Sequence, residues 1–172
     1  MKAAVGSLVF FAVAPCVVGG LVPYWLTGWQ VQTPLPFWAS VRILGAILVA
    51  IGLIVIVSAF ARFVTEGIGT PAPVAPPRQL VIGGLYRHVR NPMYVALLIA
   101  VIGQALLLGQ ALLLGQPALL VYGAVVFATV YSFVRLYEEP VLAGLFGADY
   151  DIYRQAVPGW LPRLRPWQQG SR

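Results

Sequence analysis

The sequence predicts an all-α integral membrane protein, with about four transmembrane helices and a cytoplasmic amphipathic helical segment near the C-terminus. Hydrophobic residues make up 60% of the 172 positions and charged residues only 9%, whereas about 25% of the residues in a soluble domain are charged. The apolar residues also form long uncharged stretches, and roughly 20 such residues suffice to cross a bilayer as a helix. We therefore expect a single membrane domain over residues 1–172.

Four stretches have the length and composition of membrane spans, at about residues 3–26, 42–62, 92–114 and 117–135. The last two belong to one uncharged stretch, residues 91–134, which as a single helix would be about 66 Å long. Because the hydrocarbon core is roughly 30 Å thick, this stretch must cross the membrane twice. Gly115-Gln116-Pro117 is the obvious turn between the crossings. The first stretch is longer than the apolar core of a typical cleaved signal peptide, which is the alternative for it.

Smaller features predict how these spans connect and pack. Residues 65–77 are rich in proline and glycine and predict a non-helical linker. Gly45 and Gly52 would permit close contact between helices, and Gln104 should find a partner inside the bundle or near the interface. After Pro140, apolar residues recur at roughly helical spacing, which predicts an amphipathic helix lying on the membrane surface.

The charge distribution predicts the orientation in the membrane. Net charge is +6, and with four spans all 11 Lys and Arg residues except Arg42 lie on one side. Because basic segments mark the cytoplasmic side, both termini are expected in the cytoplasm, and the short, simple chain suggests a bacterial inner membrane. The basic residues are spread over membrane-flanking segments, so nucleic acid is not an expected partner. Cys16 is the one cysteine and offers neither a disulfide nor the spacing of a metal site.

The most polar segment beside a predicted span is residues 86–94, Tyr-Arg-His-Val-Arg-Asn-Pro-Met-Tyr. A polar cluster at the mouth of a span is costly and usually has a function. Its arginines also suit a plain role as membrane anchors, and a lone interfacial histidine such as His88 is more often an anchor than a base. Anchoring explains Asn91-Pro92 less well, because an asparagine can cap a helix or bind the polar edge of a ligand.

Two adjacent carboxylates, Glu138 and Glu139, follow Arg135, which is expected to end the fourth span. They are two of only five acidic residues in the chain. Stabilising the helix that starts near Pro140 would need only one of them and is worth about 0.3–1 kcal/mol. A pair beside a cationic segment is better suited to a polar ligand with hydroxyl and amino groups, because carboxylates accept such hydrogen bonds strongly.

These residues occur in an ordered set that resembles a known family. The set is Leu85-Tyr86, Arg90-Asn91-Pro92-Met93-Tyr94, Glu138-Glu139, Phe146-Gly147-x-x-Tyr150-x-x-Tyr153 and Val157-Pro158. It resembles the isoprenylcysteine carboxyl methyltransferases, which belong to a wider group of membrane methyltransferases that includes phospholipid methyltransferases. The resemblance covers roughly residues 79–162. The family's central motif is commonly Arg-His-Pro-x-Tyr, and here Asn91 stands at the histidine position, without a titratable ring.

The resemblance implies a methyltransferase that uses S-adenosylmethionine as cofactor and acts on a lipophilic acceptor, a carboxylate or an amine, embedded in the membrane. It implies that residues 78–162 form the cofactor-binding half. The cofactor-binding residues expected from it are Gln79, Leu80, Val81, Tyr86, Arg90, Asn91, Pro92, Met93, Tyr94 and Glu138. The residues expected to act on the acceptor are Arg135, Glu139 and His88. Methyl transfer needs alignment of donor and acceptor, and no metal is expected.

Two other functions remain open at this point. Membrane reductases that use a nicotinamide cofactor have a similar C-terminal layout, although they are usually longer. A small membrane scaffold without catalytic activity is the second alternative, and Asn91 in place of the histidine keeps it open. Cofactor binding distinguishes the three, because a reductase should bind NADPH and a scaffold should bind neither cofactor or bind without turnover.

Overall fold

The computed structural model describes residues 13, 15–31, 37–67, 79–109 and 118–168, and within them it contains helices and no strands. The predicted all-α class is therefore confirmed. In chain order the elements are a π-helical turn η1 (Val17–Leu21), α2 (Val22–Thr27), α3 (Trp38–Gly67), a 3-10 turn η2 (Gly84–Arg87), α4 (Pro92–Leu108), α5 (Ala118–Phe133), a second π-helical turn η4 (Val134–Glu138), α6 (Glu139–Phe146) and α7 (Ala148–Ala156).

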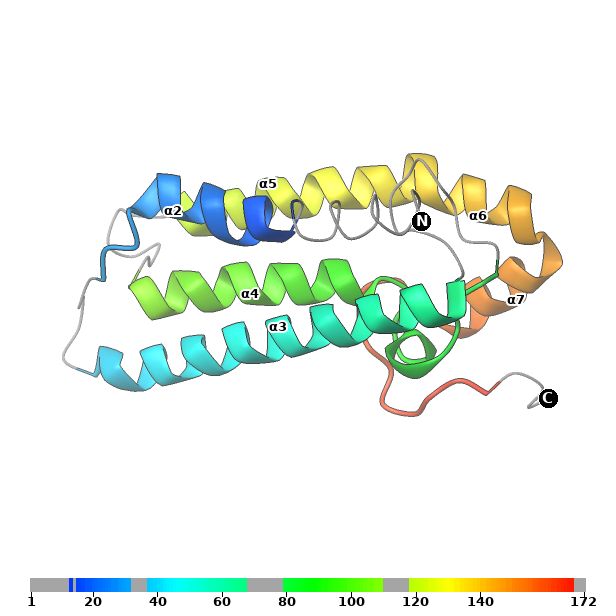
Figure 1. Cartoon of the computed structure of the whole chain (residues 1–172), viewed down its shortest axis with the longest axis horizontal. Coiled ribbons are helices and arrows are strands. Elements are labelled where there is room, and N and C mark those ends of the chain that lie inside the picture. Colours follow the sequence, from blue (N-terminus) through cyan, green and yellow to red (C-terminus); the bar gives the residue numbers. More distant parts are fainter. Residues whose placement is uncertain (1–12, 14, 32–36, 68–78, 110–117, 169–172) are drawn as a thin grey trace.

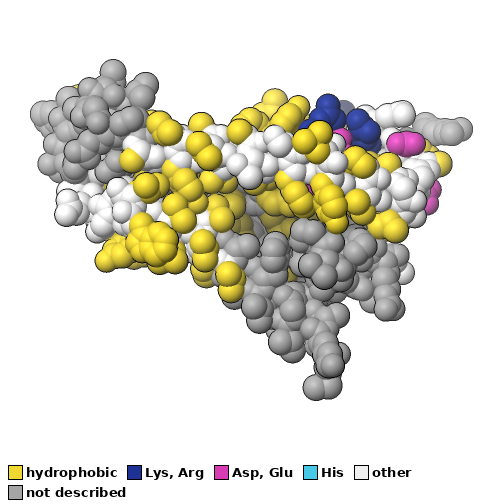
Figure 2. Space-filling model, turned by 90° about the horizontal axis from the view of Figure 1, so that it is seen from above, with side chains coloured by type: hydrophobic (Ala, Val, Ile, Leu, Met, Phe, Trp, Pro, Cys, Tyr) yellow, Lys and Arg dark blue, Asp and Glu magenta, His cyan; other side chains and the backbone are white. Residues whose placement is uncertain are grey.

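The long helices lie side by side, with α4 next to α3 and α5 alongside α4 (Figure 1). Apolar side chains are spread along the described part of the face seen in Figure 2, and charged side chains gather toward one end of it. Two helices are long and apolar enough to cross a membrane, Trp38–Arg62 and Ala118–Phe146, and the described residues also contain two shorter apolar helices, Val17–Thr27 and Pro92–Leu108. Many large apolar side chains on α3 and α5 are exposed, as expected for surfaces that face lipid.

Glycines bring α3 and α4 into the closest contact in the fold. A Cβ atom on Gly103 of α4 would lie 2.8 Å from the Gly45 carbonyl oxygen and 2.8 Å from the Val49 amide nitrogen of α3. A Cβ atom on Gly52 would lie 2.8 Å from the Ala96 carbonyl oxygen. Backbones approach this closely only where side chains are absent, so the close contacts predicted for Gly45 and Gly52 are confirmed.

The boundaries of α4 differ from those predicted. The helix begins at Pro92 as expected but ends at Leu108, not at residue 114. Gly109 adopts a left-handed conformation with φ 74°, which ends an α-helix and which glycine adopts without steric cost. The predicted turn at 115–117 lies outside the described residues. Gln104 donates a hydrogen bond to the Gly19 carbonyl oxygen at 2.7 Å, which confirms the expected partner inside the bundle.

The helix that contains the last predicted span does not end at Arg135. The helix continues from α5 through the π-helical turn η4 into α6, and the candidate span reaches Phe146. The cause is Pro140, which lacks an N–H group and would clash with the Leu136 carbonyl in a regular helix. The wider π-helical turn, in which the Glu139 N–H bonds to the Val134 oxygen, accommodates it without breaking the helix.

A π-helical turn before a proline also occurs near the N-terminus, where Pro23 comes two residues after the end of η1. In this turn the Val22 N–H bonds to the Val17 oxygen. The first predicted span, 3–26, is described only from residue 13 and its helix ends at Thr27. The linker predicted at 65–77 begins later than expected, because α3 runs to Gly67, and most of it lies outside the described residues.

A short amphipathic helix follows the second span. The chain turns at Gly147, with φ 50°, and α7 begins at Ala148. Tyr150 and Tyr153 are buried in a cluster with Val157, whereas Asp149 and Arg154 are exposed. The amphipathic helix predicted after Pro140 is therefore found in α7, whereas α6 continues the helix formed by α5 and η4. Its expected position on the membrane surface stays a prediction.

Candidate functional site

The polar site lies where the segment before α4 meets α6, α7 and the C-terminal residues. We call residues Arg87–Asn91 the arginine loop and residues Pro158–Trp167 the C-terminal strap. Pro92 occupies the first turn of α4, where its missing N–H group is not needed. Asn91, at the N-cap position, does not cap the helix. Its buried amide instead donates a hydrogen bond to the Gly159 carbonyl oxygen of the strap at 3.1 Å, so the alternative role of a cap is excluded for this residue.

Arg90 and Glu139 form the buried centre of the site. The guanidinium Nη1 of Arg90 lies 2.8 Å from Oε1 of Glu139 and also donates to the Tyr150 hydroxyl at 3.1 Å. The other carboxylate oxygen of Glu139 lies 2.9 Å from Arg135 and 3.7 Å from Arg154. The carboxylate of Glu139 is therefore surrounded by cations, and it joins α6 to the arginine loop, η4 and α7.

Glu138 has a different environment from its neighbour. Its Oε2 atom accepts a hydrogen bond from the Tyr94 hydroxyl at 3.3 Å, which is long for two oxygen atoms. That is its one hydrogen bond in the described part of the chain. Glu138 and Tyr94 thus face each other between α4 and the end of η4. Both carboxylate oxygens of Glu139 are bonded to arginines, whereas Glu138 can still accept further hydrogen bonds.

The C-terminal strap pairs with the arginine loop. Arg90 donates its backbone N–H to the Pro158 oxygen at 2.9 Å, and Arg163 donates its backbone N–H to the His88 oxygen at 3.0 Å. The Nδ1 atom of His88 lies 2.8 Å from the Arg163 carbonyl oxygen. Because a carbonyl oxygen can only accept, Nδ1 carries a hydrogen in this contact, which leaves Nε2 as the nitrogen that can accept a proton.

The structure separates the other predicted cofactor residues into groups. Val81 and Tyr86 are buried together with Ala59 of α3, and Met93 packs against them. Leu80 packs instead against the tyrosine cluster of α7. Gln79 is exposed at the start of the described segment. Of the predicted set, the structure brings together Arg90, Glu139 and Arg135 in one network and Tyr94 and Glu138 in a second contact.

Sequence reasoning did not assign roles to Tyr150, Tyr153 or the strap. Tyr150 bonds to Arg90, and the Tyr153 hydroxyl donates to the Tyr86 carbonyl oxygen at 2.7 Å. Burial raises the pKa of both phenols above the usual range, so both stay protonated. The spacing of the two tyrosines was visible in the sequence, but the strap contacts the loop mainly through backbone atoms, which leave no signal in residue types.

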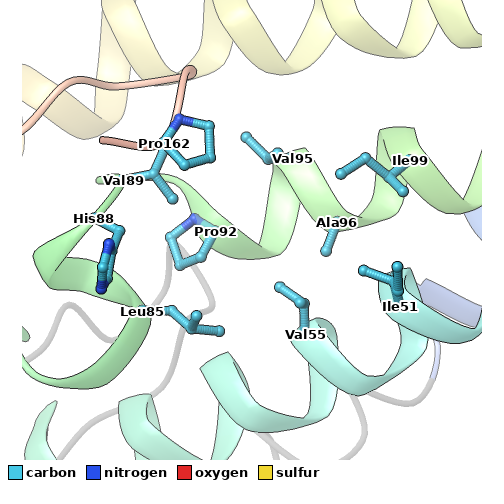
Figure 3. A pocket seen from close by; sticks show the side chains of 11 residues that line it. Ile51, Val55, Leu85, His88, Val89, Pro92, Val95, Ala96, Ile99 and Pro162 are labelled. Atoms are coloured by element: carbon cyan, nitrogen blue, oxygen red, sulfur yellow. The ribbon is translucent and has the colours of Figure 1, made fainter. Parts of the chain in front are cut away.

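An apolar cavity lies between α3 and α4 (Figure 3). Its volume is about 290 Å³, close to the lower end of the range for small-molecule pockets. His88 is the polar side chain among the residues that line it, and Pro162 of the strap closes one end. The remaining lining residues are Ile51, Gly52, Val55, Leu85, Val89, Pro92, Val95, Ala96 and Ile99.

Comparison with known proteins connects this geometry to a family. The family model for phospholipid methyltransferases matches residues 40–149. A search of curated proteins finds no match. The matched segment runs from α3 to the start of α7, so it contains both membrane-length helices, the arginine loop and both glutamates of the site. It identifies the wider group and not the isoprenylcysteine carboxyl methyltransferases in particular. Since the match spans well over half of the chain and contains Arg90, Glu138 and Glu139 of the polar site, the protein belongs to the phospholipid methyltransferase family.

Proposed function

We propose that the protein is a membrane methyltransferase that uses S-adenosylmethionine and transfers its methyl group to a membrane lipid. Family membership indicates methyl transfer to a lipid-like acceptor in a membrane, and gives no support to a reductase or a scaffold. The observation that carries the proposal further is the contrast between the two adjacent glutamates. Glu139 is held by arginines, whereas Glu138 has the single long hydrogen bond from Tyr94 among the described residues.

The free acceptor capacity of Glu138 fits the cofactor. Ribose hydroxyls and an α-ammonium group are strong hydrogen-bond donors, and a carboxylate with an unused oxygen is their natural partner. In the proposal, Glu138, Tyr94 and Asn91 bind the polar parts of the cofactor, and Pro92 and Met93 line it. The residues that contact the cofactor are supported from the buried side by Val81, Tyr86 and Leu80. Gln79 lies at the edge of the cofactor site. S-adenosylmethionine, when bound, supplies an electrophilic methyl group on a sulfonium.

Arg90 and Glu139 hold the site in shape. Their ion pair holds the arginine loop, which directly precedes α4, against α6, so that Tyr94 and Glu138 face each other. Such positioning matters because alignment of reacting groups supplies much of the rate in a displacement reaction. Arg135 is about half exposed, and only its Nη1 atom is used by Glu139. Its guanidinium also interacts with Tyr131, and its exposed N–H groups are proposed to bind an anionic group of the acceptor.

The cavity between α3 and α4 is proposed to hold an apolar chain of the acceptor. Its walls are apolar, and it lies between two helices of the membrane bundle, where lipid chains are the available ligands. Pro92 and Val95 line the cavity while Tyr94 contacts Glu138, so the first turn of α4 separates the two sites. If the acceptor is an amine, Nε2 of His88 is proposed to take its proton; an ionised carboxylate needs no base.

We extend the proposal to the topology, with four membrane spans and both termini on the cytoplasmic side. The two shorter apolar helices, Val17–Thr27 and Pro92–Leu108, add two spans to the two membrane-length helices. With four spans, both termini and the polar site lie on the cytoplasmic side, where the soluble cofactor is available. Residues 78–162 then form the cofactor-binding half of a single domain over residues 1–172. The basic surroundings are consistent with a bacterial inner membrane.

The proposed function is tested by transfer of a tritiated methyl group from S-adenosylmethionine. The protein is reconstituted in nanodiscs of phosphatidylethanolamine and phosphatidylglycerol, with or without a farnesylated cysteine. We expect label in the organic extract. Label that survives mild base identifies N-methylation of an amine, whereas label released as methanol identifies a methyl ester. A folded protein that transfers label to neither acceptor contradicts a lipid methyltransferase with either chemistry.

Filling the cavity should weaken binding of the acceptor without changing the affinity for the cofactor. Val55→Phe places a ring in the cavity, and we expect KM for the acceptor to rise at least tenfold with unchanged S-adenosylmethionine affinity. Ile54→Phe is the matched control, because Ile54 is the next residue along α3 and is 66% exposed. Equal kinetics for both variants would show that the acceptor chain lies elsewhere.

A further inference from the structure

One edge of the C-terminal strap is hydrogen-bonded to the arginine loop, and the side chains on its other edge are exposed. Its inner edge bonds to the arginine loop through Pro158, Gly159 and Arg163. Near its end, the Trp167 N–H donates to the Arg87 oxygen at 2.9 Å and Arg87 Nε donates to the Trp167 oxygen at 2.6 Å. The strap lies next to the loop that precedes α4 in Figure 1. These bonds hold it in one conformation, so the exposure of its outer edge is a property of the fold.

The outer edge carries large apolar side chains. Leu164 is 97% exposed and Leu161 is 80% exposed, which is more than any other large apolar side chain in the described residues. Two exposed leucines on a rigid, hydrogen-bonded segment are unfavourable in water, at about 25 cal/mol per Å² of apolar surface. The exposed surface therefore indicates a partner for the outer edge of the strap.

The position of the strap on the bundle identifies the surroundings of these leucines. Trp160 packs against the side of α5, with ring centroids 5.3 Å from Phe127 and 5.7 Å from Tyr131. Both rings belong to a helix long and apolar enough to cross a membrane. Tyr131 is about one helical turn before Arg135, the first charged side chain of that helix. Trp160 thus lies at the depth where tryptophan is enriched, between hydrocarbon and headgroups.

The charge of the strap favours one kind of lipid surface. Arg163 and Arg165 flank Leu164, and the sequence contains no Asp or Glu after Asp151. Arg165 is exposed, and Arg163 is partly buried and bonds to the Ala156 oxygen. Basic residues beside inserted apolar side chains are attracted to anionic headgroups, at about 1 kcal/mol per residue. An acidic protein surface lacks the hydrocarbon layer that two leucines at membrane depth would enter.

We propose that the C-terminal strap is an interfacial anchor that inserts Leu161 and Leu164 into an anionic leaflet. Arg165 contacts lipid phosphates, and Trp160 and Trp167 flank the inserted leucines. Through its hydrogen bonds the strap then ties the arginine loop, and with it Asn91 and His88, to the membrane surface. This anchor depends on the fold and the membrane location, and it holds whether or not the protein transfers methyl groups.

The proposal is tested with a nitroxide spin label at Leu164→Cys in a Cys16→Ser background, reconstituted in nanodiscs containing phosphatidylglycerol. Power saturation with oxygen and with a water-soluble nickel chelate reports the depth of the label. We expect oxygen contact to dominate several-fold at position 164. Asp149→Cys is the control, because Asp149 is exposed on the polar face of α7 and its label should contact nickel. Replacing phosphatidylglycerol with phosphatidylcholine should move the label at 164 toward water.

Two outcomes overturn the anchor. A label at 164 as accessible to nickel as that at 149 places the outer edge in water. A label shielded from both oxygen and nickel places it against protein, such as a second copy of the chain. The substitution Leu164→Cys removes no contact of the described fold, because the side chain is almost fully exposed, so misfolding does not compete with these outcomes.

Discussion

Replacing Arg90 with alanine is expected to abolish methyl transfer and to lower the free energy of unfolding by about 3–5 kcal/mol, because it removes one partner of a buried ion pair. Arg90 joins the arginine loop to Glu139, Tyr150 and the Val157 carbonyl oxygen at the same time. Its side chain is 12% exposed and that of Glu139 is 7% exposed. The measurement is thermal unfolding in detergent together with the methyl-transfer assay.

Arg154→Ala is the matched control for this prediction. Arg154 also approaches Glu139, but at 3.7 Å and with a side chain that is 43% exposed. Exposed pairs of this kind contribute about 0–1 kcal/mol, so stability and activity should remain close to wild type. If the two alanine variants lose stability equally, the Arg90–Glu139 pair is not the centre of the site.

Gly103→Ala is expected to disrupt the contact between α3 and α4. The added Cβ atom would lie 2.8 Å from the Gly45 oxygen and the Val49 nitrogen, and both are backbone atoms that cannot rotate away. Overpacking of this kind costs about 1–3 kcal/mol. Since the cavity lies between the same two helices, the KM for the acceptor should rise as well. Unfolding midpoints and acceptor kinetics measure the two effects.

Gly144→Ala makes the same chemical change on α6, where a Cβ atom meets nothing within 4 Å. Alanine is more favourable than glycine inside a helix by about 0.8–1.0 kcal/mol. We therefore expect the opposite sign, a small gain in stability. Two alanine variants with the same effect would mean that helix propensity, and not the α3–α4 contact, determines the result at Gly103.

The helices could be predicted from the sequence because membrane spans depend on composition over many residues. The stretch around Glu138-Glu139-Pro140 could not, because a charged pair before a proline usually marks a helix boundary. Here a π-helical turn absorbs the proline and the helix continues to Phe146. The early end of α4 before Gly109 was equally hidden, since this glycine lies within the uncharged stretch 91–134, whose composition predicts continuous helix there.

Part of the site could also be predicted, because its residue types stand out in the sequence. The contacts of Arg90 with Glu139 and of Tyr94 with Glu138 join charged or polar side chains, and these residues stand out in an apolar chain. Asn91 was recognised as polar, but its bond to the Gly159 oxygen depends on a backbone atom far along the sequence. Much of the pairing between the arginine loop and the C-terminal strap is made by backbone groups, which every residue carries, so only the fold reveals it.

Binding of S-adenosylmethionine, measured by calorimetry in detergent, tests the central proposal most directly. We expect micromolar binding to the wild type, loss of binding in Glu138→Ala, and unchanged binding in Asp149→Ala, whose exposed carboxylate lies outside the site. Absence of S-adenosylmethionine binding in folded wild-type protein, or equal binding to both variants, would contradict the assignment of Glu138 to the cofactor.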